Sequence, residues 1–111
     1  MERINPMIIT IGDKEYTLEF SRKTAKMAEA GGFKREDVAD KLMTRIPELF
    51  YYAFKMHHSD IKRETTDKIL FEDLEGLTES ELDKLVALFN APYETLINSN
   101  GERKNGRVTV R

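Results

Sequence analysis

The residues with the chemistry to act as catalysts or metal ligands are the adjacent pair His57 and His58, the serines and the many carboxylates. Successive residues of a helix point about 100° apart, so the two histidines cannot share one metal ion as a His-x-x-x-His pair does. The serines fall at expected helix ends or in loops, and none occupies the strained strand-to-helix turn of a serine nucleophile. We therefore expect no metal site and no catalytic nucleophile.

Cofactor binding and acid–base chemistry also lack a recognisable pattern. Gly31-Gly32 follows an expected helix, whereas a dinucleotide-binding loop follows a strand. No two carboxylates are placed together in an apolar stretch that would separate their pKa values. The chain has no Cys, which removes disulfides, thiol catalysis and thiolate metal ligands together. We expect a protein that is not an enzyme and that holds no cofactor.

Length and composition indicate one domain with a modest core. The chain has 111 residues, of which 34% are charged and 40% hydrophobic. It contains no run near the roughly 20 apolar residues of a membrane span. The first residues lack the hydrophobic region of a signal peptide. These features favour a cytoplasmic protein without a membrane partner.

Charge is distributed unevenly along the chain. The net charge is −2, and the helices that could enter a DNA groove are acidic or apolar, so we do not expect a nucleic-acid partner. Residues 98–111 carry a net charge of +3. We interpret a cluster of carboxylates around one junction between helices as a solvated face with helix-start charges. The cluster consists of Glu72, Asp73, Glu75, Glu79, Glu81 and Asp83.

Residues 7–20 predict a β-hairpin. Gly12-Asp13 suits a two-residue turn because Gly tolerates positive φ. If Ile11 faces Lys14, then Ile9 faces Tyr16 and Met7 faces Leu18. This register places the apolar side chains of both strands, with Phe20, on one face; the other face is mostly polar and includes Glu19.

Five helices are expected after the hairpin, at about residues 22–30, 35–45, 47–58, 62–74 and 78–97. Ser21 is a natural N-cap for the first helix, in which Thr24, Met27 and Ala28 should be buried. Pro47 suits the first position of the third helix, where its missing N–H costs nothing. Thr78 and Glu81 form a capping box, and Pro92 should kink or split the last helix near Asn90.

The fold class is therefore α+β, with an N-terminal hairpin packed on a bundle of about five helices. Residues 1–97 should form a single domain, and residues 98–111 a polar, basic C-terminal tail that cannot build a core of its own. Within that tail, Arg107–Arg111 alternates like a short strand that could extend the hairpin. A tail without such a strand is the other interpretation.

The stretch from Pro47 to His58 concentrates four aromatic residues and a Met, so we expect it to be the central helix. Most of these rings can form the core. Tyr51, Tyr52 and Met56 lie off the main apolar stripe, and such side chains are favoured at adaptable protein interfaces.

The order of these signals resembles the small tail assembly chaperones of long-tailed bacteriophages and prophages. The similarity rests on the hairpin sequence from Ile11 to Phe20, the helix ending in Ala30-Gly31-Gly32, and the aromatic helix that leads into the segment from His57 to Glu64. A final helix containing Glu81 to Phe89 completes it. Together, the similar features span about residues 7–97.

The resemblance implies a non-catalytic protein that binds and solubilises the tape-measure protein, a long and largely helical polypeptide, and helps recruit tail-tube subunits. It implies action in the cytoplasm of the bacterial host and absence from the mature virion. An apolar groove would take up the partner's helices, and self-association through the same surface is an open alternative. The candidate groove residues are Phe50, Tyr51, Tyr52, Phe54, Met56, Phe89 and Tyr93.

Two other functions remain open from the sequence. A small structural phage protein of the head–tail connector type would assemble into a stable ring by itself. A nucleic-acid-binding regulator would show binding to DNA that weakens steeply with salt.

Overall fold

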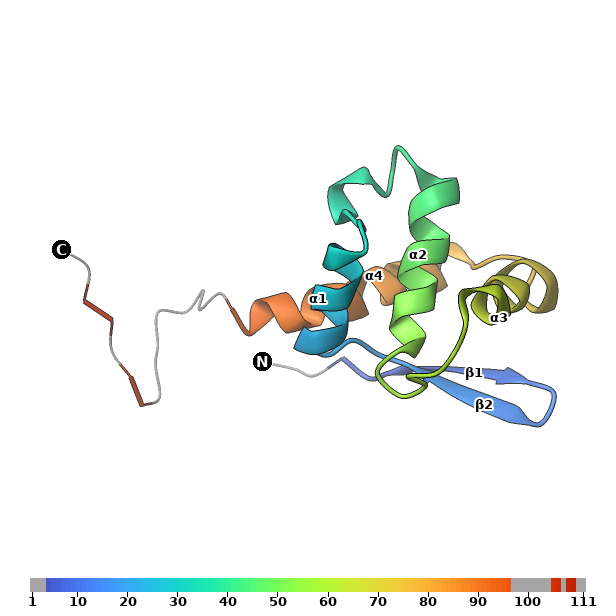
Figure 1. Cartoon of the computed structure of the whole chain (residues 1–111), viewed down its shortest axis with the longest axis horizontal. Helices are drawn as coiled ribbons and strands as arrows, with labels where there is room; N and C mark the ends of the chain where they lie inside the picture. Colours follow the sequence, from blue (N-terminus) through green and yellow to red (C-terminus); the bar gives the residue numbers. More distant parts are fainter. Residues whose placement is uncertain (1–3, 97–104, 107, 110–111) are drawn as a thin grey trace.

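The fold consists of an N-terminal hairpin and four α-helices in the computed structural model, which describes residues 4–96, 105–106 and 108–109 (Figure 1). The α+β class is confirmed. Four α-helices rather than five are present in the described part of the chain, together with one 3-10 helix and one π-helical turn. Of the basic tail, only residues 105–106 and 108–109 are described, and they belong to no helix or strand.

The hairpin has the predicted register. Strand β1 (Met7–Ile11) pairs antiparallel with β2 (Lys14–Leu18), and Ile9 lies opposite Tyr16. Gly12 adopts a φ of 62° at the turn, a conformation that is cheap only for Gly. Ile9 and Leu18 are buried, whereas Ile8 on the other face is 51% exposed, so the apolar face packs against the helices as expected.

Glu19 departs from the prediction, because it is buried although it was assigned to the polar face. Strand β2 ends at Leu18, and the backbone N–H of Glu19 instead donates to the carbonyl of Ala53 at 2.9 Å. The Glu19 carboxylate lies 2.9 Å from Nε2 of His57. These bonds attach the end of the hairpin to the C-terminal part of α2 (Leu42–Phe54) and satisfy the buried polar groups.

Helix α1 (Arg22–Ala30) matches its predicted range. The Ser21 hydroxyl accepts a hydrogen bond from the N–H of Thr24, and the Thr24 hydroxyl accepts one from the N–H of Ser21. Thr24 and Ala28 are buried as predicted. The prediction for Met27 is wrong, since its side chain is 38% exposed.

The predicted helix over residues 35–45 is replaced by a short 3-10 helix, η1 (Arg35–Asp37), followed by turns. Helix α2 begins at Leu42 and continues through Pro47, which is therefore not its first residue. A proline inside a helix leaves the carbonyl four residues earlier without its partner. Here that carbonyl belongs to Met43, which is 80% exposed, so water can supply the missing hydrogen bond.

The fourth predicted helix is present in two parts. Helix α3 (Arg63–Lys68) continues into the π-helical turn η2 (Ile69–Asp73), which is marked by a hydrogen bond from the Leu74 N–H to the Ile69 carbonyl at 2.8 Å. The last helix, α4 (Glu79–Glu94), has the predicted capping box and runs through Pro92 without the predicted split. The helix ends at Glu94, before the predicted end: residues 95–96 form a turn, and residue 97 lies outside the described residues.

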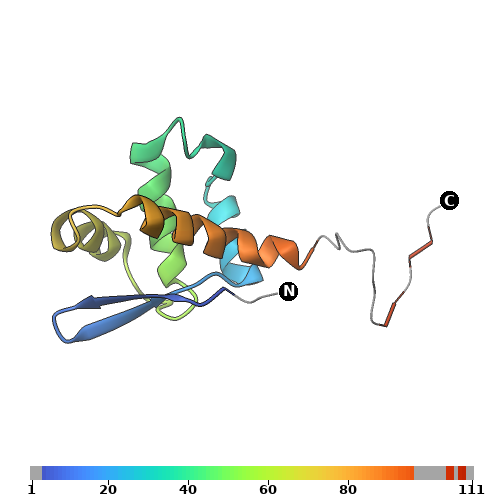
Figure 2. The same cartoon turned by 180° about the vertical axis from the view of Figure 1, so that it is seen from behind.

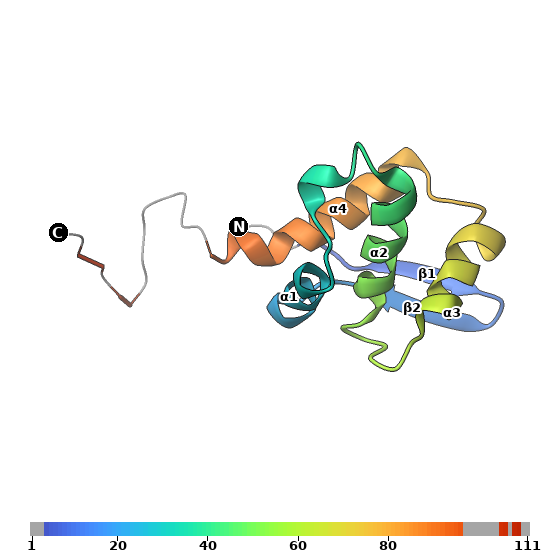
Figure 3. The same cartoon turned by 45° about the horizontal axis from the view of Figure 1, so that its top comes forward.

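The four helices and the hairpin surround one core. Helix α2 packs against α1, α3, α4 and β2, which confirms its central position. Helix α4 crosses one side of α1 and α2, and the hairpin lies along the C-terminal end of α2 (Figures 1 and 2). Viewed from the top, α2 stands between α1 and α3 (Figure 3). The largest fully buried side chains include Phe50, Phe54, Phe89, Leu18, Leu49 and Leu85.

Within the described ranges, none of the helices is both long and apolar enough to cross a membrane.

Candidate functional site: apolar clefts at the two ends of α4

Three of the predicted groove residues lie in the core, although Phe89 also lines, with Tyr93 and Arg35, a cleft of about 300 Å³. Phe50 and Phe54 are fully buried and pack edge to face with their ring centroids 5.0 Å apart. Phe89 is 2% exposed and packs edge to face against Phe20 and Phe33. Edge-to-face packing of rings interlocks side chains from different elements. These phenylalanines therefore hold the fold together, and almost none of their surface is exposed in the folded chain.

Tyr51 and Tyr52 lie together on another side of α2 and are half-buried. Lys55 and Arg63 sit over the Tyr51 ring, at 5.0 and 6.0 Å from its centroid. Tyr52 covers Gly31, where an added Cβ would lie 2.1 Å from the Tyr52 hydroxyl. Both rings thus already have intramolecular contacts that fix their positions.

Tyr93 is half-buried on α4 and packs against Phe89 with ring centroids 5.4 Å apart. The guanidinium of Arg35 lies 4.9 Å from the centre of its ring. Burial, followed by the hydrogen bond to Glu29, raises the pKa of Tyr93 to about 12. The hydroxyl is therefore held in its neutral, donating form.

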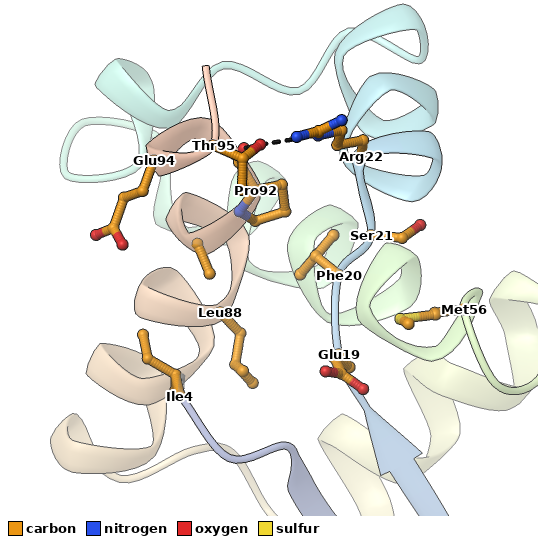
Figure 4. Close-up of a pocket in the computed structure, with 11 residues that line it drawn as sticks. Ile4, Glu19, Phe20, Ser21, Arg22, Met56, Leu88, Pro92, Glu94 and Thr95 are labelled. Carbon is orange, nitrogen blue, oxygen red and sulfur yellow. Dashed lines mark hydrogen bonds between the residues drawn. The ribbon is translucent and has the colours of Figure 1, made fainter. Parts of the chain in front are cut away.

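Met56 borders a cleft beside the C-terminal half of α4 (Figure 4). The cleft has a volume of about 350 Å³, and Met56 is 40% exposed at its edge. Nε of Arg22 donates to the Thr95 hydroxyl at 2.8 Å, a bond that links the start of α1 to the end of α4. The apolar side chains around it are Ile4, Phe20, Met56, Leu88, Ala91 and Pro92.

A second cleft of about 350 Å³ adjoins the first, because Arg22 and Pro92 line both. Tyr93 and Leu96 border it from α4 and the turn that follows, and Leu96 is 66% exposed. Of the seven predicted groove residues, Met56 and Tyr93 therefore border neighbouring clefts on the two sides of Pro92. The structure does not bring all seven into one groove.

A third cleft lies at the other end of α4 and was not predicted. It has a volume of about 170 Å³ and is nearly all apolar. Leu42, Met43 and Phe71 line it, although they are 50%, 80% and 51% exposed. We call it the Met43 cleft. Its lining consists of Leu42, Met43, Ile46, Pro47, Leu70, Phe71, Gly76, Leu77 and Leu82.

The sequence does contain a signal for the Met43 cleft. Ile69, Leu70 and Phe71 are three consecutive apolar residues, and a helix cannot bury all of them on one face. Ile69 and Leu70 are buried and Phe71 is left outside. The π-helical turn lies over the same residues, a local feature that is frequent at functional sites.

The two histidines have structural contacts. Nε2 of His58 accepts a hydrogen bond from the N–H of Thr17 at 3.0 Å, and the His58 ring packs on Tyr16. Burial, and to a lesser degree the neighbouring His57, lowers the pKa of His58. In the part of the chain that the structure describes, no group of three His, Asp or Glu side chains could hold a metal ion.

The sequence model of a family described as "Domain of unknown function (DUF5055)" matches residues 5–111. Comparisons with curated proteins and with solved structures gave no match. The match to the family covers nearly the whole chain, and the chain belongs to this family.

Proposed function

We propose that this member of the DUF5055 family is a non-catalytic tail assembly chaperone, which binds and solubilises the tape-measure protein and helps recruit tail-tube subunits. The proposal combines the resemblance described above with the exposed apolar clefts. In this proposal the chain acts in the host cytoplasm and is left out of the finished virion.

The observation that carries the proposal is the Met43 cleft. A protein of this size usually hides its largest apolar side chains, and exposed apolar patches mark sites of protein interaction. Here Leu42, Met43 and Phe71 gather at one cleft and are each at least half exposed. Methionine is flexible and polarizable, which suits a surface that must accommodate varied helices.

The two clefts beside Pro92 supply a second apolar surface at the other end of α4. A helix of 16 residues is about 24 Å long, so the two surfaces could contact well-separated points on an extended partner. Two modest sites on one partner reinforce each other through their effective concentration. A chaperone that covers a long helical protein would use such an arrangement.

The experiment that tests the function is co-expression with the tape-measure protein encoded in the same gene cluster. The wild-type chain should keep that protein in the soluble fraction and co-purify with it. Tape-measure protein that is equally insoluble with and without this chain would refute the proposal.

A matched pair of variants connects this test to the cleft. Met43→Asp should abolish the solubilising effect because a carboxylate cannot enter an apolar contact without a partner. Met27→Asp makes the same substitution at another exposed helix position, outside the clefts described above, and should retain the effect. Circular dichroism of both variants checks that they are folded.

A further inference from the structure

The chain segment that forms one side of the Met43 cleft is acidic. Residues 68–84, which supply five of its lining residues, contain six carboxylates and two lysines, a net charge of −4. Glu72 directly follows Phe71, Glu75 directly precedes Gly76, and Glu79 comes two residues after Leu77. All six carboxylate residues are exposed. The segment from η2 to the start of α4, which supplies part of the apolar lining, therefore carries a net negative charge on exposed side chains.

Two of these carboxylates are used within the fold. Asp73 lies 3.4 Å from Nζ of Lys68, and the Glu81 carboxylate accepts the N–H of Thr78 in the capping box at 2.8 Å. The other four make no ion pair within residues 4–96. These four are Glu72, Glu75, Glu79 and Asp83. They remain available to cations from outside the molecule.

The α2 side of the cleft does not neutralise this charge. Arg45 is in contact with Glu48 at 2.7 Å and with Asp37 at 3.3 Å. Among residues 40–48, the two basic and the two acidic side chains cancel. The negative charge next to the Met43 cleft is therefore unbalanced.

We propose that the Met43 cleft binds a basic amphipathic helix, whose apolar side chains enter the cleft while its Lys and Arg residues face Glu72, Glu75 and Glu79. This inference rests on the proposed function and names the chemistry of the partner segment. Apolar residues three and four positions apart lie on one helix face, and the residues beside them reach the border of a groove. Opposite charges at the border orient the helix and speed its association.

The test uses designed peptides with purified full-length chain. One peptide is an amphipathic helix with Leu at every third and fourth position, Lys elsewhere and a single Trp; its partner has Glu in place of Lys. The chain contains no Trp, so the fluorescence of the peptide reports binding without background. The basic peptide should bind at least roughly tenfold more tightly than the acidic one, and added salt should weaken that preference.

Variants of the chain separate the apolar and the charged contributions to peptide binding. Met43→Asp should abolish binding, whereas Met27→Asp should leave it unchanged. The triple variant E72Q/E75Q/E79Q should bind the basic peptide roughly tenfold more weakly than wild type does, and this binding should no longer depend on salt. Its matched control, D13N/E15Q/D60N, removes three exposed carboxylates that line none of the clefts described above and should bind like wild type.

The possible results distinguish this inference from the proposed function. If the two peptides bind equally, or if E72Q/E75Q/E79Q has no effect, the inference is overturned, even where the chain still solubilises the tape-measure protein. If the basic peptide binds as expected but the tape-measure protein stays insoluble, the proposed function fails and the inference stands. Concentration-dependent dimerisation that is lost in Met43→Asp, without peptide binding, would identify a second copy as the occupant and overturn the inference.

Discussion

At the scale of single residues, the polar side chains around the core have defined partners that explain their chemistry. His58 accepts a hydrogen bond from the backbone of β2, His57 lies beside the buried Glu19, and the Tyr93 hydroxyl is held by Glu29. None of these groups needs a metal or a substrate to account for its position. They join elements that are far apart in the sequence.

The free energy of unfolding should fall in mildly acidic solution, because the folded state disfavours protonation of His58. Its pKa in the folded chain is lowered, so the unfolded chain binds more protons as the pH falls below the ordinary histidine value of about 6.5. The contribution is fully present above that pH and is lost as the pH falls toward the folded pKa. Urea unfolding at several pH values measures the effect.

The control for this prediction is His58→Gln, whose side-chain oxygen can accept the Thr17 N–H but does not titrate in this range. The variant should lose the part of the pH dependence that His58 contributes. A variant with the same pH dependence as wild type between pH 5 and 7, roughly the histidine range, would contradict the assignment.

Tyr93 should ionise only in strongly alkaline solution. Burial and the contact with Glu29 raise its pKa to about 12, well above the ordinary value. The ultraviolet absorbance of tyrosinate follows the ionisation. Tyr93→Phe should remove an ionisation step near pH 12. Loss of a step near pH 10, about where free tyrosine titrates, would show that the pKa of Tyr93 is not raised.

At the scale of elements, the sequence-based prediction was correct where several local signals agreed. The Gly12-Asp13 turn and the strict alternation of the strands specified the hairpin register, and the Ser21 and Thr78 caps marked true helix starts. The prediction for Pro47 was wrong, because this residue lies inside a continuous helix, and Pro92 does not split α4. A proline costs one backbone hydrogen bond, which solvent access and tertiary packing can offset.

The segment before α2 shows another limit of periodicity. Val38, Leu42 and Ile46 are spaced four apart as in one helix, yet the chain between η1 and α2 is a turn. Val38 and Ile46 are partly buried through tertiary contacts, and Leu42 is half exposed. The spacing of apolar residues indicates which side chains will be buried, but not whether they belong to one helix or to two separate segments.

The turn after η2 gives a test at the element scale. Glu75 and Gly76 have φ values of 55° and 97°, in the region that favours glycine. Gly76→Ala should destabilise the fold by about 1–2 kcal/mol through backbone strain, since no atom lies within 4 Å of an added Cβ. Gly106→Ala, which also meets no atom but lacks a positive φ, is the control and should be neutral. Equal unfolding free energies for the two variants would contradict the reasoning.

At the scale of the whole molecule, the candidate site was the least predictable feature. Aromatic abundance correctly indicated that α2 is central, but the phenylalanines became the core by interlocking across elements. The exposed apolar residues of the Met43 cleft lie at the start of α2 and in η2. Which face of a helix stays uncovered depends on the packing of the other elements, and a single-sequence pattern does not contain that information.

Core and cleft residues should differ sharply in their effect on stability. Phe50→Ala should cost about 3–5 kcal/mol because it leaves a cavity in the core. Met43→Asp should change the free energy of unfolding by no more than about 0.5 kcal/mol, since Met43 is 80% exposed. Urea denaturation measures both. A large loss in Met43→Asp would mean that the residue supports the fold, and its use as a binding variant would then be invalid.

Methionine methyl NMR can show whether Met43 lies in the partner interface, because the chain has five methionines and Met43 is the most exposed of those compared above. The sample would be the purified chain, labelled at the methionine methyl groups, with and without the helical region of the tape-measure protein. We expect the Met43 signal to shift and broaden on binding while the Met27 signal does not move. A bound complex in which the Met43 signal stays at its free position would contradict this expectation.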